Sequence, residues 1–153
     1  MRTGNSFTVE CFVLIHATAS KIWDVLINPE KIRVYLYGST VITDWKAGSQ
    51  ILFTRDRLHP KAPISEKLIV DRGKILEIEN EKFLSFSFFS SMEGYADLAE
   101  NYSVVSYTLN REDVNSFRLD YRRTNIPLEI EKRNQDKFMP GMMGQIRMSS
   151  GRI

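Results

Sequence analysis

The sequence predicts an α+β fold in which a curved antiparallel sheet of about seven strands surrounds one long C-terminal helix. Three observations predict it. Most of the chain up to residue 125 alternates apolar and polar residues between turn signals, as antiparallel strands do. Two short helical stretches follow the first strand, and beyond Leu128 the apolar spacing becomes helical to the end of the chain.

The first strand and the two short helices occupy residues 7–38. Phe7–His16 is rich in Val, Ile, Phe and Thr and contains no Gly or Pro, which is typical of a largely buried strand. Ser20 is expected to cap the first helix, which ends at Asn28 because a proline follows. Pro29 suits the first turn of a second helix that extends to Gly38.

The middle of the chain is expected to form the remaining strands. Turn residues at 46–49 and 112–115 predict two hairpins. Pro60 and Pro63 interrupt any ladder, because proline donates no backbone hydrogen bond, so an edge or open loop is expected at residues 57–65. The expected strands are residues 40–45, 50–55, 67–78, 83–89, 101–110 and 116–125.

One face of the later strands is expected to form an aromatic concavity. Successive strand side chains point to opposite faces, so Arg118, Asp120 and Arg122 are expected to face away from it. The inward set by this parity is Leu84, Phe86, Phe88, Val105, Tyr107, Leu109, Phe117, Leu119 and Tyr121.

The C-terminal helix is expected to be interrupted at Pro140 and Gly141, since proline removes a backbone donor and crowds the preceding turn. The Met-rich part beyond the break is then expected to act as a movable gate over the concavity. The candidate buried positions of this helix are Ile130, Phe138, Met142, Met143 and Ile146.

Composition narrows the class of protein. The chain has 153 residues, of which 42% are hydrophobic, which is enough for one domain (1–153) with a sizeable core. The net charge of +2 is spread without a basic block, so nucleic acid is not an expected partner. A single cysteine, Cys11, and an N-terminus without an apolar export segment favour the cytoplasm. No apolar run approaches the roughly 20 residues that cross a bilayer, so integral membrane association is not expected.

The sequence offers little for catalysis or metal binding. His16 and His59 lie far apart and there is no C-x-x-C spacing, so neither a metal nor a cofactor is expected. Glu77 and Glu79 are expected to be solvated. The second acidic group, Glu93, Asp97 and Glu100, follows the strand at 83–89, and Asp97 and Glu100 are considered as residues that face a ligand at this connection.

Several ordered segments carry a resemblance to a known family. They are ATASKIWDVLINPE (17–30), DWKAGS (44–49), and GKILEI (73–78) leading to LSF (84–86). Together these segments resemble the START-like superfamily (SRPBCC), and within it the heat-shock protein 90 ATPase activator homologue family. The resemblance covers residues 7–125 and implies a helix-grip fold with a cavity for an apolar ligand.

The resemblance and the periodicity together give candidate ligand-lining residues. Large aromatic and Met side chains fill any core of this size, so core packing remains an equally direct interpretation of the same residues. The candidates are Trp23, Tyr35, Phe53, Phe86, Phe88, Tyr107, Leu119, Tyr121, Met139, Met142 and Met143.

Three functions follow from these observations. The first is binding of an apolar or amphipathic small molecule without covalent chemistry or a cofactor. The second, implied by the family, is association with a chaperone, although the activators that name the family carry an additional N-terminal chaperone-binding domain that is not expected in this chain. The third is an enzyme of the polyketide cyclase or dehydratase type, for which few inward His, Asp or Glu residues are available.

Overall fold

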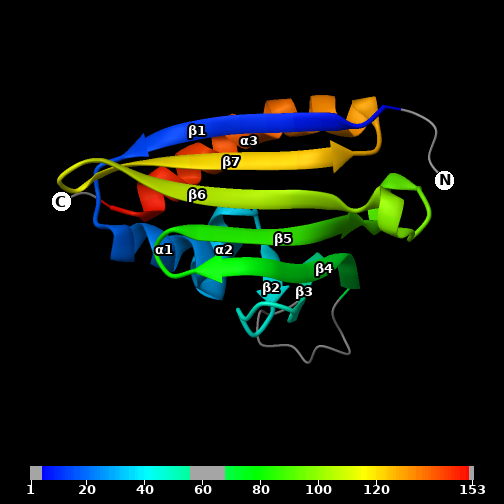
Figure 1. Ribbon diagram of the computed structural model, residues 1–153, viewed down its shortest axis with the longest axis horizontal. Helices are drawn as coiled ribbons and strands as arrows, with labels where there is room; N and C mark the ends of the chain where they lie inside the picture. Colours follow the sequence, from blue (N-terminus) through cyan, green and yellow to red (C-terminus); the bar gives the residue numbers. More distant parts are fainter. Residues whose placement is uncertain (1–4, 56–67, 152–153) are drawn as a thin grey trace.

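The computed structural model describes residues 5–55 and 68–151. In these residues seven strands form one antiparallel sheet in the order β1-β7-β6-β5-β4-β3-β2, and three helices lie on one face of it (Figure 1). The strands are β1 (Phe7–Ile15), β2 (Ser39–Ile42), β3 (Gln50–Arg55), β4 (Leu68–Glu79), β5 (Phe83–Ser90), β6 (Ser103–Asp113) and β7 (Ser116–Ile126). The helices are α1 (Ala19–Ile27), α2 (Pro29–Tyr35) and α3 (Glu129–Ser149), and the β5–β6 connection holds the 3-10 turns η2 (Ser91–Glu93) and η3 (Ala99–Asn101). The predicted α+β fold class is confirmed.

The element bounds differ from the predicted ones at several helix and strand ends: α2 ends at Tyr35 instead of Gly38, β2 ends at Ile42 instead of residue 45, and β6 spans 103–113 instead of 101–110. Thr18, not Ser20, caps α1, because its side-chain oxygen accepts a hydrogen bond from the backbone N–H of Lys21. Asn28 caps α2 in the same way through the N–H of Glu30, and Pro29 occupies the first turn as predicted. The predicted loop at residues 57–65 lies outside the described residues.

The predicted inward face is confirmed by the register of the central strands. Tyr107 of β6 is paired with Tyr121 of β7, and Leu109 is paired with Leu119, so their side chains share one face. All four are buried, whereas Arg118 and Arg122 on the opposite parity are exposed. The inner face meets the helices and forms the hydrophobic core.

The expected break in the C-terminal helix is wrong, because α3 continues through Pro140 and Gly141 to Ser149. Pro140 is exposed, so its missing donor removes one backbone bond on the solvent side. The opposite side of the helix buries Met139, Met142, Met143 and Ile146. Burial of such side chains stabilises by about 1.5–3 kcal/mol each, which exceeds the loss of one bond. The predicted gate required a break in the helix, so the continuous α3 does not support it.

Trp23 offers a test of how α1 is held against the sheet. Its side chain is only 4% exposed and belongs to the core cluster. We expect Trp23→Ala to lower the free energy of unfolding by about 3–5 kcal/mol, measured by urea denaturation. Phe12→Ala is the control, because Phe12 is 58% exposed on β1 and its loss should cost less than about 1 kcal/mol. Equal losses for the two variants would contradict the buried position of Trp23.

Pro140 offers a test of the unbroken helix. We expect Pro140→Ala to raise the free energy of unfolding by about 1–2 kcal/mol, because the helix regains a backbone hydrogen-bond donor. The greater freedom of the unfolded chain without the proline offsets part of this gain. The measurement is thermal unfolding followed by circular dichroism, with the exposed Lys137→Ala as a neutral control. A loss of stability in Pro140→Ala would indicate that the proline is adapted to a bend in α3.

Candidate functional site

A cavity of about 580 Å³ lies between the inner face of the sheet, α3 and the turn that joins α2 to β2. Phe53, Phe86, Phe88, Val105, Tyr107 and Tyr121 line it from the sheet, and Phe138, Met139 and Met142 line it from α3. The polar members of the lining are Ser39, Asp71, Arg123 and Gln135, and Leu36, Tyr37 and Gly38 complete it. The volume falls within the range of small-molecule binding pockets in proteins.

The structure divides the candidate lining residues between this cavity and the adjoining core. Phe53, Phe86, Phe88, Tyr107, Tyr121, Met139 and Met142 line the cavity. Trp23, Tyr35, Leu119 and Met143 do not line it and are buried in the core cluster beside it. The resemblance and the periodicity together gave all of them as lining residues, but what lies opposite each side chain depends on the helices.

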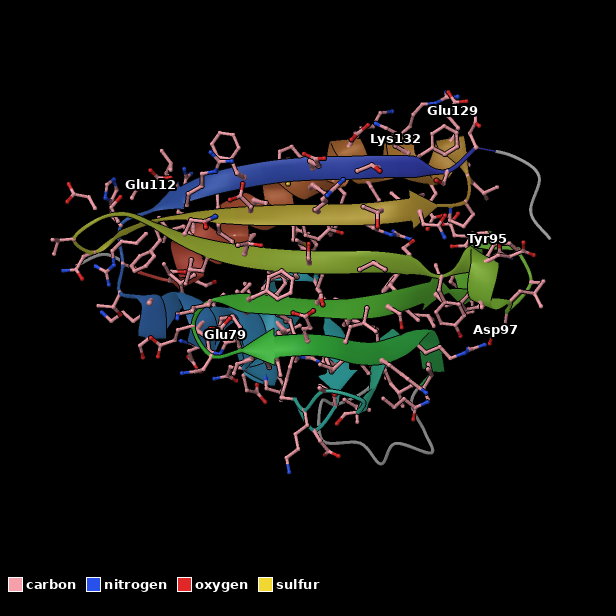
Figure 2. All side chains as sticks on the ribbon, viewed as in Figure 1. Glu79, Tyr95, Asp97, Glu112, Glu129 and Lys132 are labelled. Atoms are coloured by element: carbon pink, nitrogen blue, oxygen red, sulfur yellow. The ribbon has the colours of Figure 1, made fainter. Side chains whose placement is uncertain are left out.

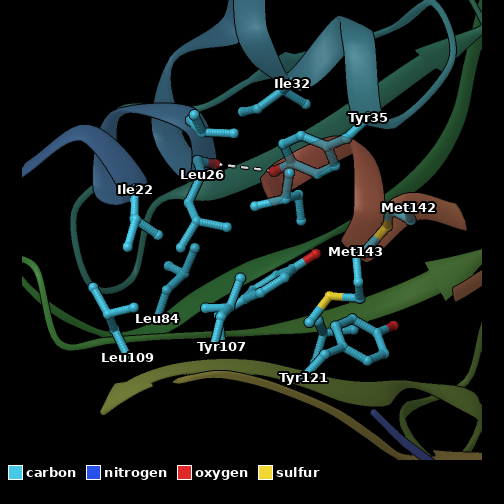
Figure 3. Close-up of a cluster of buried hydrophobic side chains, with 14 of the residues drawn as sticks. Ile22, Leu26, Ile32, Tyr35, Leu84, Tyr107, Leu109, Tyr121, Met142 and Met143 are labelled. Atoms are coloured by element: carbon cyan, nitrogen blue, oxygen red, sulfur yellow. Dashed lines mark hydrogen bonds between the residues drawn. The ribbon is translucent and has the colours of Figure 1, made fainter. Parts of the chain in front are cut away.

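Tyr35 shows why a buried phenol need not face a ligand. Its hydroxyl donates a hydrogen bond to the backbone carbonyl of Leu26, with 3.1 Å between the oxygens (Figure 3). The bond joins α2 to the last turn of α1 and satisfies the polar end of the side chain. Burial raises the pKa of the Tyr35 hydroxyl, so it remains a protonated donor.

Tyr107 and Tyr121 lie edge to face on the cavity wall, with ring centroids 5.3 Å apart. Within the described residues neither hydroxyl makes a hydrogen bond, and Figure 3 shows both rings facing α3 and its methionines. Burial raises the pKa of Tyr121 to about 12 and that of Tyr107 well above its ordinary value. Both hydroxyls are therefore protonated at neutral pH and can donate hydrogen bonds.

A buried ion pair at one side of the cavity was missed by the sequence analysis. Arg123 of β7 and Glu131 of α3 are 2% and 3% exposed, and Nη2 of Arg123 lies 2.5 Å from Oε2 of Glu131. The hydroxyl of Tyr95 donates to the same carboxylate, 3.1 Å from Oε2. The sequence did contain a pattern that predicts the inward position of Arg123, because strand parity puts it on the same face as Leu119 and Tyr121.

The pair also explains a wrong burial prediction. Ile130 was expected in the core but is 53% exposed, and the neighbouring Glu131 is buried in its place. A carboxylate is stable in a buried position when charged and hydrogen-bonding partners surround it, as Arg123 and Tyr95 do here. At the start of α3, the side that carries Glu131 therefore faces the core and the side that carries Ile130 faces solvent.

Two aromatic side chains form the rim of the cavity. The rings of Tyr37, in the α2–β2 turn, and Phe138, on α3, meet edge to face with centroids 5.5 Å apart. Tyr37 is 59% exposed, with a positive φ of 51°. A Cβ atom at Gly141 would lie 3.3 Å from the Tyr37 hydroxyl, so this glycine leaves room for the ring to cross the helix. The rim is thus a contact between the α2–β2 turn and α3.

The acidic groups considered from the sequence lie elsewhere. Glu77 and Glu79 are exposed as predicted, and Glu79 is at the opposite end of the sheet from Tyr95 and Asp97 (Figure 2). Asp97 accepts hydrogen bonds from Arg72 and Tyr102 at the surface, which lower the pKa of its carboxyl group. Neither Asp97 nor Glu100 lines the cavity.

Glu93 lies near the ion pair. Burial raises the pKa of its carboxyl group, and the neighbouring negative charge of Glu131 raises it further.

In the part of the chain that the structure describes, no group of His, Cys, Asp and Glu is arranged to hold a metal ion. None of the described helices is both long and apolar enough to cross a membrane.

A curved seven-stranded sheet around a C-terminal helix, with a cavity between them, defines an α+β protein of the helix-grip class. The family model "Activator of Hsp90 ATPase homolog 1-like protein" matches residues 16–147. The chain belongs to this family. No curated protein matches it.

Solved structures with the same fold include proteins from several organisms. ChR145 from Cytophaga hutchinsonii is 30% identical, with a TM-score of 0.71 and coverage of 92% of this chain and 91% of that one. An HSP90 activator from Plasmodium falciparum is 14% identical, with a TM-score of 0.68 over 92% and 94% of the two chains. CalU16 from Micromonospora echinospora is 15% identical, with a TM-score of 0.69 over 99% and 80%. The last two show likeness of fold alone.

The buried ion pair yields a stability prediction. Arg123→Met alone leaves the Glu131 carboxylate buried without its counter-charge, so we expect a loss of about 3–5 kcal/mol in the free energy of unfolding. Arg123→Met combined with Glu131→Leu should regain most of that loss, because no charge is left unpaired. Urea unfolding of the two single variants, Arg123→Met and Glu131→Leu, and of the double variant measures the difference.

Arg122→Met is the matched control. Arg122 is the next residue of β7, on the opposite face, and its contact with Glu10 at 3.4 Å is exposed, so its loss should change stability little. A double variant as unstable as the sum of its single variants would show that the pair is not coupled.

Proposed function

We propose that this protein binds an apolar or amphipathic small molecule in the cavity, without covalent chemistry. The observation that carries the proposal is the cavity itself, whose volume of about 580 Å³ suits one small molecule and whose walls are mainly aromatic and methionine side chains. The ring of Phe53 lies tilted against that of Phe86 and edge to face with that of Phe88, with centroids 5.8 and 5.4 Å away, so the aromatic wall is continuous. Met139 and Met142 supply adaptable apolar surface on the other side.

Binding can be tested with the neutral fluorescent probe N-phenyl-1-naphthylamine. We expect saturable binding at one site per chain with enhanced fluorescence. Val105→Phe should weaken binding at least tenfold, because Val105 lines the cavity and the larger side chain takes up its space. Val104→Phe is the matched control, since Val104 is the adjacent residue of β6 on the outer face and is partly exposed.

Two outcomes would contradict this proposal. The first is an absence of saturable binding to the folded protein. The second is equal weakening by Val105→Phe and Val104→Phe, which would place the probe on the surface. Native mass spectrometry of protein purified from its own host provides an independent check, because a retained ligand adds its mass to the chain.

Association with the chaperone Hsp90 is the second proposed function, and membership of the family supports it. Here we expect this protein to raise the ATPase rate of purified Hsp90 and to bind it in solution. Val105→Phe should leave this effect intact if the chaperone contacts the outer surface. An unchanged ATPase rate together with no detectable complex would refute the proposal.

An enzyme of the polyketide cyclase or dehydratase type is less well supported. Among the described residues the cavity lining contains one carboxylate, Asp71, and no histidine. His16 is exposed at the end of β1, away from that lining. We assign no catalytic residue. We also propose a cytoplasmic location, in keeping with the single cysteine, Cys11, of the sequence.

A further inference from the structure

Two tyrosine hydroxyls on the cavity wall have no hydrogen-bond partner in the described part of the chain. Tyr107 of β6 and Tyr121 of β7 are each 6% exposed, and both line the cavity. The third buried tyrosine, Tyr35, differs because its hydroxyl donates to the carbonyl of Leu26. Buried polar groups in folded proteins are almost always paired, so two neighbouring exceptions in one cavity are candidate ligand contacts.

A molecule in the cavity can reach both hydroxyls. Among the described residues, Nε of Arg123 is the single fully enclosed side-chain nitrogen or oxygen atom without a hydrogen bond. The unpaired oxygens of Tyr107 and Tyr121 are therefore not fully enclosed, and the space beside these residues is the cavity that they line. Figure 3 shows both side chains reaching from the sheet toward α3 and its methionines.

The other polar residues that the sheet contributes to the lining cannot accept hydrogen bonds from these hydroxyls. The sheet order places β5 between β6 and β4, so Asp71 of β4 lies about 10 Å from β6, and Ser39 of β2 lies farther away. Arg123 carries donors only. The inward neighbours of Tyr107 on β5 and β6 are apolar, namely Leu84, Phe86 and Val105.

The two tyrosines offer donors to the same part of a ligand. They are directly paired across β6 and β7, and their rings meet edge to face. Burial raises the pKa of both hydroxyls, so each keeps its proton at neutral pH. A carbonyl oxygen has two lone pairs and no proton, so it accepts these bonds and brings no further donor that needs a partner. A hydrocarbon in the same place would leave both hydroxyls buried and unpaired, which is costly.

We propose that Tyr107 and Tyr121 are the specificity-determining residues of the cavity, and that they select an apolar ligand with a carbonyl oxygen to which their hydroxyls donate hydrogen bonds. This inference rests on the proposed ligand-binding function and deepens it by naming the class of ligand and the residues that recognise it. The remainder of the ligand then lies against the aromatic and methionine walls.

Tyrosine-to-phenylalanine substitution tests the hydroxyls alone, because the ring stays in place. Displacement of N-phenyl-1-naphthylamine gives the affinities of 2-acetonaphthone, a ketone, and of 2-isopropenylnaphthalene, in which C=CH₂ replaces C=O. We expect the double variant Tyr107→Phe with Tyr121→Phe to weaken ketone binding about tenfold, as two hydrogen bonds between neutral groups provide, and not to weaken alkene binding. Tyr35→Phe is the matched control and should change neither affinity, because Tyr35 does not line the cavity.

The stability of the free protein gives the opposite pattern for the same variants. Tyr35→Phe removes a hydroxyl that bonds the carbonyl of Leu26, so its urea unfolding midpoint should fall. Tyr107→Phe and Tyr121→Phe remove hydroxyls without a partner in the described residues, so their midpoints should stay the same or rise. A fall for these two variants would show that the hydroxyls serve the fold, and it would overturn the inference.

Infrared spectroscopy detects the hydrogen bonds directly. The carbonyl stretching band of bound 2-acetonaphthone is isolated as the difference between the ¹²C=O and ¹³C=O forms of the ketone. We expect this band to lie at lower frequency in the native protein and in Tyr35→Phe than in hydrocarbon solvent. In the double variant it should return toward the frequency in hydrocarbon.

The outcomes separate the two proposals. Equal effects of the double variant on ketone and alkene, or an unchanged ketone affinity, overturn the inference while ligand binding stands. No binding of any probe to the native protein refutes the proposed function and the inference with it. If the double variant fails to fold, a carbonyl band at the hydrocarbon frequency in the native protein overturns the inference, and the two single variants carry the comparison of affinities.

Discussion

The packing of three helices against the inward-facing apolar side chains of a curved seven-stranded sheet is the contact on which the rest of the structure depends. The 21-residue helix α3 packs on β1 and β7, while α2 packs beside β2 and touches α3. All three helices lie on the same face of the sheet (Figure 1). Between α2 and α3 the inner face of the central strands remains uncovered by backbone, and the cavity occupies that space.

The Arg123–Glu131 pair connects this architecture to the chemistry of the cavity. Leu128 provides no side-chain cap for α3, so the buried contact of Glu131 with Arg123 and Tyr95 is a principal anchor of the first turns of the helix. Desolvating two charges is costly, and apolar residues of similar volume often stabilise a fold as well or better.

Membership of the Hsp90 activator-like family and the presence of a cavity point to two different surfaces. A ligand would use the inner face of β5, β6 and β7, whereas a chaperone would contact the exterior of the molecule. The rim formed by Tyr37 and Phe138 is where the two surfaces meet, because both side chains border the cavity and Tyr37 is exposed.

The sequence by itself determined the order of the elements, the antiparallel sheet and the side of each central strand that faces inward. Side-chain alternation along a strand has a period of two, so the positions of Phe86, Tyr107 and Tyr121 followed from local pattern alone. The tertiary structure decided which inward residues line the cavity and which, like Leu119 and Met143, pack in the core, because that depends on what the helices place opposite them. It also decided the continuity of α3 through Pro140, since burial of the opposite helix face outweighs one lost bond. Likewise, only the contact with Arg123 makes the burial of Glu131 stable, and no helical periodicity encodes a partner that lies on another element.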